Sequence, residues 1–297
     1  MVYFLAGLLL GLSVAIPVYV WVARGTEKRV RQASRRALAA ERLAELGKLT
    51  GGLAHEIKNP LSSVNLNIQL LQEDLQQIAV GNGKQANQLD SQDLADRLGR
   101  INRRFETMSR EVHRLRDILD DFLRFAGRVK LDLVSINLNE LIDELVDFFT
   151  PQASTAGVRL RAQPSNEDSI IQGDASLLKQ AILNLLINAT QSMDQARADK
   201  LPSGGNDELL VRIEAAREGG GNFWRIHVTD TGPGIETEKA EKIFQPYFST
   251  KRNGTGLGLP TTRRIIEEHG GTLSFHSEPG RGSDFMISLP TSVPIDR

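Results

Sequence analysis

The stretch LAHEIKNPLSSVNLNIQLLQEDLQQI, residues 53–78, repeats apolar side chains at steps that alternate between four and three after Ile57. This spacing places one apolar seam along a helix. A second seam with the same steps runs from Leu98 to Phe122, after the polar segment GNGKQANQLDSQD at residues 81–93. We expect two antiparallel helices joined by a loop. Because one such hairpin buries little apolar surface, we expect two copies of the chain to form a four-helix bundle.

His55 stands apart from that seam. It lies about 160° around the helix from Ile57, on the face away from the seam. Glu56 flanks it, and Asn59 follows one turn later on the same face. A solvent-facing histidine beside a carboxylate differs from a core histidine, so His55 is a candidate nucleophile. A structural coiled coil that carries an ordinary surface histidine is the alternative.

The N-terminal segment, residues 2–22, contains no charged side chain. It has about the length of 20 residues that a membrane-spanning helix needs. The basic side chains that follow are Arg24, Lys28, Arg29, Arg31, Arg35 and Arg36. Since positive flanks stay inside, we expect a single-pass anchor in the inner or plasma membrane, with the remainder of the chain in the cytoplasm. A cleaved signal peptide or a buried helix is the alternative.

The composition narrows the function classes. The chain has 297 residues, a formal net charge of -1 and no cysteine. The length allows about two globular domains. No global basic charge argues for a nucleic-acid partner. The lack of cysteine excludes disulfides, thiolate metal sites and a cysteine nucleophile.

From about residue 130 the pattern mixes helices and strands. We expect helices at Asn139–Phe149, closed by Pro151, and at Ala175–Met193, with Asp174 as N-cap. The expected strands lie within residues 131–138, 158–163, 169–174, 209–216, 223–230, 271–278 and 284–290. Helices mixed with antiparallel strands predict an α+β sandwich with one helical face.

Three polar signals lie on that frame. Asn184 and Asn188 share one face of an otherwise apolar helix, where buried amides need partners. A magnesium ion with triphosphate oxygens would serve; amides that cap loops are the alternative. DTGPG, residues 230–234, ends a strand. NGTGLGL, residues 253–259, precedes a helix, and such glycine-rich turns cradle phosphates with backbone N–H groups. Each signal is weak by itself.

Two resemblances join these signals. HEIKNPL, residues 55–61, resembles the phosphoacceptor motif of sensor histidine kinases. The asparagine helix, DTGPG, IFQPYFSTK and GTGLGL, in this order, resemble the ATP-binding domain that these kinases share with gyrase, the Hsp90 chaperones and the MutL proteins. Together they cover about residues 43–290. They imply an α plus α+β chain, with a transmembrane helix at 1–24, a helical linker at 25–44, a dimerisation and histidine phosphotransfer domain at 45–128, and a Bergerat-type ATP-binding α/β sandwich at 129–292.

The resemblance also implies roles. His55 would take the phosphoryl group of ATP, and Glu56 would orient the ring or accept its proton. Asn59 would help to remove phosphate from the partner regulator; pairing with backbone freed by Pro60 is its alternative. Asn188 would ligate Mg²⁺ with Asn184 assisting, Asp230 would bind the adenine amine, Lys251 would reach the terminal phosphates, and Phe244 and Phe248 would pack a lid at about residues 234–254. The other residues expected at ATP are Gly232, Gly234, Gly254, Thr255, Gly256, Leu257 and Gly258.

The implied activity is that of a protein histidine kinase. A homodimer would phosphorylate itself with ATP and Mg²⁺, then pass the phosphoryl group to an aspartate in the receiver domain of a response regulator. The first rival is an ATPase of the gyrase or Hsp90 type, in which a glutamate four residues before the metal-binding asparagine activates water. Asn184 holds that position here and cannot act as a base. The second rival is a scaffold with a vestigial nucleotide site.

Overall fold

The computed structural model describes residues 51–76, 91–127, 130–200, 206–218, 221–251 and 254–291. The predicted membrane anchor lies outside these ranges. No helix within them combines the length and the apolar character that crossing a membrane requires. The chain divides into two compact units, residues 1–55 and 56–297. The described part of the first unit is residues 51–55, and these are helical.

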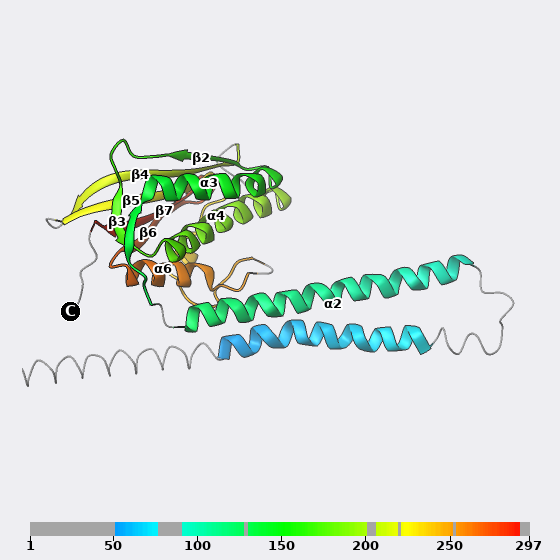
Figure 1. Ribbon diagram of the computed structural model, residues 1–297. Helices are drawn as coiled ribbons and strands as arrows, with labels where there is room; N and C mark the ends of the chain where they lie inside the picture. The colour runs from blue at the N-terminus through cyan, green and yellow to red at the C-terminus, as the bar shows by residue number, and fades with distance from the viewer. Residues whose placement is uncertain are drawn as a thin grey trace, which may run out of the picture. The chain divides into compact units, whose positions relative to one another are not determined.

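Two long helices form the predicted hairpin. Residues 51–76 are helical, Pro60 included, and helix α2 spans Ser91–Ala126, so it begins inside the segment predicted as loop (Figure 1). Asp74 pairs with Arg104 at 2.9 Å, and Glu56 with Arg114 at 3.7 Å. A later residue of the first helix thus meets an earlier residue of α2. The helices are therefore antiparallel, as predicted.

The apolar seams are only partly covered within this single chain. Leu71, Ile118 and Phe125 are buried at 6%, 1% and 7% exposure, although Ile118 and Phe125 lie outside the predicted seam. The exposed seam residues are Leu61, Ile68, Leu75, Leu98, Phe105, Val112 and Leu119. Both helices therefore present an apolar face that the hairpin itself does not bury.

The C-terminal part is a helix-covered sheet. Its five strands run in the spatial order β2, β4, β5, β7, β6, with bounds Arg159–Gln163, Glu208–Glu218, Gly221–Asp230, Gly282–Pro290 and Thr272–Glu278. A separate antiparallel pair joins β1 (Val134–Asn137) to β3 (Ile170–Gly173). The pair β2–β4 is parallel, unlike our antiparallel expectation. Parallel neighbours need a long crossover, and the chain between β2 and β4 supplies one because it contains helix α4.

Three helices cover one face of the sheet (Figure 1): α3 (Leu138–Thr155), α4 (Ala175–Ala198) and α6 (Gly258–Glu268). Asp174 caps α4 as predicted, accepting hydrogen bonds from the backbone N–H groups of Ser176 at 3.0 Å and Leu177 at 3.1 Å. Helix α3 continues past Pro151, where we expected it to end. Phe149 and Ala153 are both fully buried on either side of that proline. Their burial offsets the one backbone hydrogen bond that proline removes.

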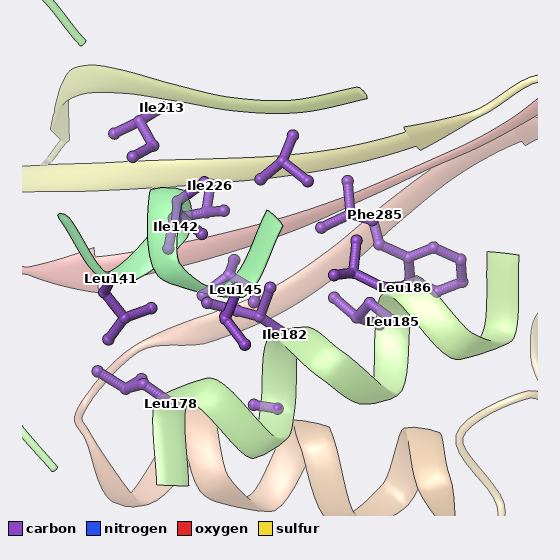
Figure 2. Packing of buried hydrophobic residues seen from close by; sticks show 14 of the residues in the cluster. Leu141, Ile142, Leu145, Leu178, Ile182, Leu185, Leu186, Ile213, Ile226 and Phe285 are labelled. Atoms are coloured by element: carbon purple, nitrogen blue, oxygen red, sulfur yellow. The ribbon is translucent and has the colours of Figure 1, made fainter. Parts of the chain in front are cut away.

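The core lies between these helices and the sheet. Figure 2 shows Leu178, Ile182 and Leu185 of α4 close to Leu141, Ile142 and Leu145 of α3, beneath the strands that carry Ile213 and Ile226. Alternation on β5 turns Trp224, Ile226 and Val228 toward this core. One face of α4 is thereby fixed against the sheet, and the opposite face is left for polar side chains.

Phe149 and Phe148 offer a matched test of this packing. Phe149 is fully buried and Phe148 is 70% exposed on the same turn of α3. We expect Phe149→Ala to lower the free energy of unfolding by about 3–5 kcal/mol, because it leaves a cavity in the core. Phe148→Ala should change it by less than about 0.5 kcal/mol. Urea denaturation measures both, and equal effects would contradict the assigned core.

Candidate active site

Asp230 ends β5 and carries a buried carboxylate, with the residue 6% exposed. Its Oδ1 accepts a hydrogen bond of 2.8 Å from the backbone N–H of Gly232. Burial raises the pKa of Asp230 to about 6, with a smaller contribution from Asp284, against the lowering effect of the Gly232 and Ser283 backbone groups and of Lys251. The charged form is thus short of stabilising partners. A ligand that donates a hydrogen bond there would supply one.

The turn after Asp230 is held against the tip of the β6–β7 hairpin. Gly234 has φ +70°, and a side chain there would collide with the carbonyl group of Glu278. The backbone N–H of Ile235 donates to Ser277 Oγ at 2.8 Å, and the backbone N–H of Gly280 donates to the carbonyl oxygen of Pro233 at 2.7 Å. These contacts hold the backbone of DTGPG in place beside Asp230.

Lys251 lies against the polar face of α4. Lys251 Nζ donates to Asn188 Oδ1 at 2.9 Å, to the carbonyl oxygen of Asn188 at 3.3 Å and to Gln191 Oε1 at 2.8 Å. Burial lowers the pKa of Lys251 to about 8, and the charge of Asp230 opposes this shift. The structure therefore brings Asn188 and Lys251 together, as the predicted site requires.

Asn184 has a different setting from Asn188. Its Nδ2 lies 3.5 Å from the carbonyl oxygen of Gly258 and 3.4 Å from Thr262 Oγ1. Thr262 Oγ1 in turn donates to the carbonyl oxygen of Gly258 at 3.0 Å. Asn184 thus ties α4 to the first turn of α6. This setting favours the structural alternative that we considered for the amide pair, for Asn184 alone.

The glycine-rich loop brings the start of α6 beside Asn188. A Cβ added to Gly258 would lie 3.8 Å from Asn188 Nδ2. Gly256 has φ +66°, and a Cβ there would lie 2.5 Å from the carbonyl carbon of Tyr247, so only glycine fits. Leu257, the N-cap of α6, is fully buried and provides no side-chain cap. The first N–H groups of α6 are therefore suited to an anion.

The remaining residues expected in the lid or at ATP either pack within the domain or contact α2. The Phe244 ring packs edge-on against Phe275 with centroids 5.7 Å apart, and the Arg263 guanidinium lies 5.4 Å from its centroid. Phe248 is partly buried against the core, consistent with the packing role expected of it. Gly254 follows Lys251, and its backbone N–H donates to the Lys251 carbonyl at 3.3 Å. Thr255 Oγ1 donates to Asp121 Oδ2 of α2 at 2.8 Å.

The five histidines differ in their surroundings. His269 is 1% exposed, accepts from the backbone N–H of Asp174 at 3.0 Å and lies 2.7 Å from the carbonyl oxygen of Ile265. His227 is 7% exposed between Asp284 and Glu214. His113 and His276 are exposed on α2 and β6. His55 is exposed in the first unit, and Asn59 is exposed on the same helix. Because His227 and His269 are buried, neither ring can accept a phosphoryl group from a large partner domain.

Comparison with known proteins identifies both parts of the chain. Residues 45–127 match the His Kinase A (phospho-acceptor) domain family, and residues 173–293 match the family described as histidine kinase-, DNA gyrase B- and HSP90-like ATPase. The chain belongs to the sensor histidine kinase family.

Relatives of this chain include sensor histidine kinase ZraS of Escherichia coli (strain K12), 32% identical over 253 residues, which are 85% of this chain and 47% of ZraS. Sporulation kinase B of Bacillus subtilis (strain 168) is 30% identical over 86% of this chain and 52% of its own length. The chain thus spans about half the length of these relatives. Among solved structures, histidine kinase ThkA in complex with response regulator protein TrrA has TM-score 0.60 and 28% identity, over 86% of this chain and 65% of ThkA.

Sequence reasoning missed several residues that shape this candidate site. Gln191 accepts from Lys251, Thr262 receives the Asn184 amide, and Ser277 holds the backbone after DTGPG. Gln191 alone had a usable signal, because it lies three residues after Asn188 and so shares its face of α4. Thr262 and Ser277 meet their partners only through the tertiary fold, at sequence separations of 78 and 42.

The raised pKa of Asp230 predicts that the stability of the protein without nucleotide depends on pH. Between about pH 4 and 6 the unfolded chain has released the proton of Asp230 and the folded chain retains it. This group therefore lowers the free energy of unfolding as pH rises, by roughly 3 kcal/mol in all for a shift of about two pKa units. Asp230→Asn should remove this decline and be more stable than the parent at pH 7.5.

Urea denaturation from pH 4 to 8 measures this difference. Asp143→Asn is the control for loss of one charge, because Asp143 is exposed on α3. Parallel pH profiles for the parent and Asp230→Asn would contradict the assigned burial of the charge.

Proposed function

We propose that this chain uses ATP to phosphorylate its own His55 and then transfers the phosphoryl group to an aspartate in the receiver domain of a response regulator. It is thus a protein histidine kinase of a two-component system. The observation that carries the proposal is the cluster at Asn188, where a lysine ammonium, an amide oxygen and an uncapped helix N-terminus meet. Such a cluster suits the triphosphate of a nucleotide.

ATP fits the polar groups of the site at both ends. At one end, the buried Asp230 carboxylate gains a hydrogen-bond donor from the exocyclic amine of adenine. At the other, the triphosphate lies against the first N–H groups of α6 and within reach of Lys251. Gly232, Gly234, Phe248, Gly254, Thr255, Gly256 and Leu257 complete the surroundings that we assign to ATP, together with Gly258.

A magnesium ion fits the donor set at Asn188. In nucleotide sites Mg²⁺ takes one or two protein oxygens, and the remaining ligands are phosphates and waters. Asn188 Oδ1 already accepts a hydrogen bond from a cationic group, the Lys251 ammonium. The described residues contain no group of three or more His, Cys, Asp or Glu side chains that could hold a metal without help. We therefore assign the metal to Asn188, and to Asn184 only an assisting role through the position of α6.

The reaction forms a bond between a ring nitrogen of His55 and the γ-phosphorus of ATP and breaks the bond from that phosphorus to the β–γ bridging oxygen. ADP leaves, and the ring gives up its N–H proton. Lys251 and the α6 N-terminus stabilise charge on the phosphate oxygens, and positioning provides most of the acceleration. Glu56 is proposed to orient the ring or take the proton, although its carboxylate also lies 3.7 Å from Arg114.

The rival functions have less support. An ATPase of the gyrase type needs a carboxylate base near position 184, and Asn184 is engaged with α6 instead. A scaffold would not need a buried Asp230 charge, which destabilises the fold without a ligand. Labelled ATP separates the three. A kinase retains acid-labile, base-stable label, an ATPase releases phosphate, and a scaffold does neither.

The organisation proposed for the chain rests on the exposed seam of the hairpin and on the sequence of the N-terminal segment. Residues 45–128 would dimerise, because the exposed seam of the hairpin gains a partner in a second copy. Residues 129–292 would bind ATP, and residues 25–44 would link the hairpin to an anchor at residues 1–24. The solved complex of ThkA with a response regulator supports a receiver domain as the partner. A membrane location, with the catalytic region in the cytoplasm, rests on the sequence of residues 2–36.

His55→Gln tests the acceptor. We expect it to abolish self-labelling from γ-labelled ATP, because the amide has no nucleophilic ring nitrogen, while nucleotide affinity stays at the parent value. His113→Gln is the control, since His113 is also exposed on the helical hairpin. Autoradiography after base treatment measures the label. Label that persists in His55→Gln and disappears in His113→Gln would move the acceptor to α2.

Asn59 tests a phosphatase activity on the regulator, which we include in the proposal. Its amide can hold the attacking water, since it donates and accepts hydrogen bonds. Asn59→Ala should keep most self-phosphorylation and slow dephosphorylation of the phosphorylated regulator by about ten- to a hundredfold. The decay of labelled regulator with kinase and ADP measures this rate. If Asn59 only supports the backbone beside the buried Pro60, the substitution should instead lower helix stability and self-phosphorylation together.

A further inference from the structure

Gln191 belongs to a row of amides along α4. Asn184, Asn188 and Gln191 are spaced by four and three residues, so they share one face of the helix. Asn184 is engaged with α6, and the other two amides both receive hydrogen bonds from Lys251. The lysine comes from the segment between α5 (Thr237–Ala240) and α6, 60 residues after Gln191. Gln191 thus contributes to a tertiary contact that ties this segment to α4.

The ammonium group of Lys251 is fully occupied in this arrangement. It has three N–H donors, and three oxygens lie around it, namely Asn188 Oδ1 at 2.9 Å, the Asn188 carbonyl at 3.3 Å and Gln191 Oε1 at 2.8 Å. We name these three contacts the lysine latch. Gln191 provides the shortest of them.

The latch uses the atom that the proposed function assigns to Mg²⁺. A magnesium ion lies about 2.0–2.1 Å from its oxygen ligands. An ammonium 2.9 Å from the same amide oxygen would then be close to a divalent cation, with strong repulsion between the charges. The two cations therefore exclude one another at Asn188 Oδ1.

We propose that Gln191 is a positioning residue that holds the Lys251 ammonium on α4 as a placeholder for Mg²⁺, which the metal–nucleotide complex displaces from Asn188. The placeholder part rests on the proposed function. The latch part concerns the nucleotide-free protein alone. The latch part predicts that loss of Gln191 loosens the segment around Lys251. The placeholder part predicts that the same loss makes Asn188 easier for the metal to reach.

The latch is tested by amide hydrogen exchange in the nucleotide-free full chain. The reporters are the backbone N–H groups of Tyr247, Phe248, Lys251 and Gly254, which are hydrogen-bonded within this segment. Gln191→Ala should speed their exchange by about two- to fivefold, as for loss of an exposed charged contact. Lys251→Met should do so at least as much. In the Lys251→Met background, Gln191→Ala should have no further effect, because the contact is already lost.

Gln195→Ala is the matched control. Gln195 is the same residue type one turn further along α4, and its side chain contacts Asp199 at 3.5 Å rather than Lys251. It should leave exchange at the four reporters unchanged. Equal exchange in parent and Gln191→Ala, or additive effects of Gln191→Ala and Lys251→Met, would overturn the latch.

The placeholder is tested by binding rather than by activity. Calorimetry with ADP at stepped Mg²⁺ concentrations gives the concentration for half-maximal nucleotide affinity. Gln191→Ala should lower it by up to about fivefold, because the competing ammonium is held less tightly, and Gln195→Ala should not. An unchanged or higher value in Gln191→Ala would overturn the placeholder. The exchange measurement needs no ADP, so it decides the latch even if the parent binds no ADP, a result that would contradict the proposed function alone.

Discussion

Helix α4 is the element on which the site depends, because one of its faces packs on the sheet and the opposite face carries the amides of the site. Leu178, Ile182 and Leu185 lie on the face that packs on the sheet, and all three are at most 1% exposed. This apolar contact removes the freedom of the helix to rotate or slide. The amides on the opposite face are then fixed in space relative to Asp230 at the end of β5.

The remaining parts of the site are attached to α4 through the tertiary fold. Asn184 joins α4 to the start of α6, and His269, at the end of α6, accepts a hydrogen bond from the backbone N–H of Asp174, the cap of α4. Each end of α6 is therefore tied to α4 by one side chain. The glycine-rich loop that precedes α6 is constrained in turn, which explains why a buried histidine far from the chemistry belongs to the framework of the site.

Some parts of this framework could be predicted from the sequence, and others could not. The strands, the capping role of Asp174 and the antiparallel hairpin followed from local periodicity and capping chemistry, and the structure confirms them. The parallel pairing of β2 with β4 did not follow, because strand order depends on how the chain crosses the sheet. Helix α3 was expected to end before Pro151, because propensity counts the lost hydrogen bond and not the burial of Ala153. Glu56 was considered only as a partner of His55, and its ion pair with Arg114 needs the hairpin to be folded.

The predicted site residues show the same difference between what the sequence could predict and what it could not. Motif resemblance selected Asn188, Asp230 and Lys251, and the structure places the lysine ammonium against the amide. Motif resemblance did not select Gln191, because none of the quoted motifs includes this residue. It gave Asn188 the metal and Asn184 an assisting role, but it could not show that the Asn184 amide contacts Gly258 and Thr262 of α6. That contact depends on where α6 lies in the tertiary fold.

The candidate site contains several groups that destabilise the fold by themselves and that a nucleotide would stabilise. Asp230 carries a pKa of about 6 because of burial, Lys251 a pKa of about 8 for the same reason, and α6 begins without a side-chain cap. These features lower the stability of the free domain. A ligand with a donor amine at one end and anionic oxygens at the other compensates each of them, so part of its binding free energy is relief of costs already present in the fold. By linkage, such a ligand must raise the stability of the domain as it binds. The same burial that weakens the empty protein thereby becomes selective for a ligand that matches all three groups at once.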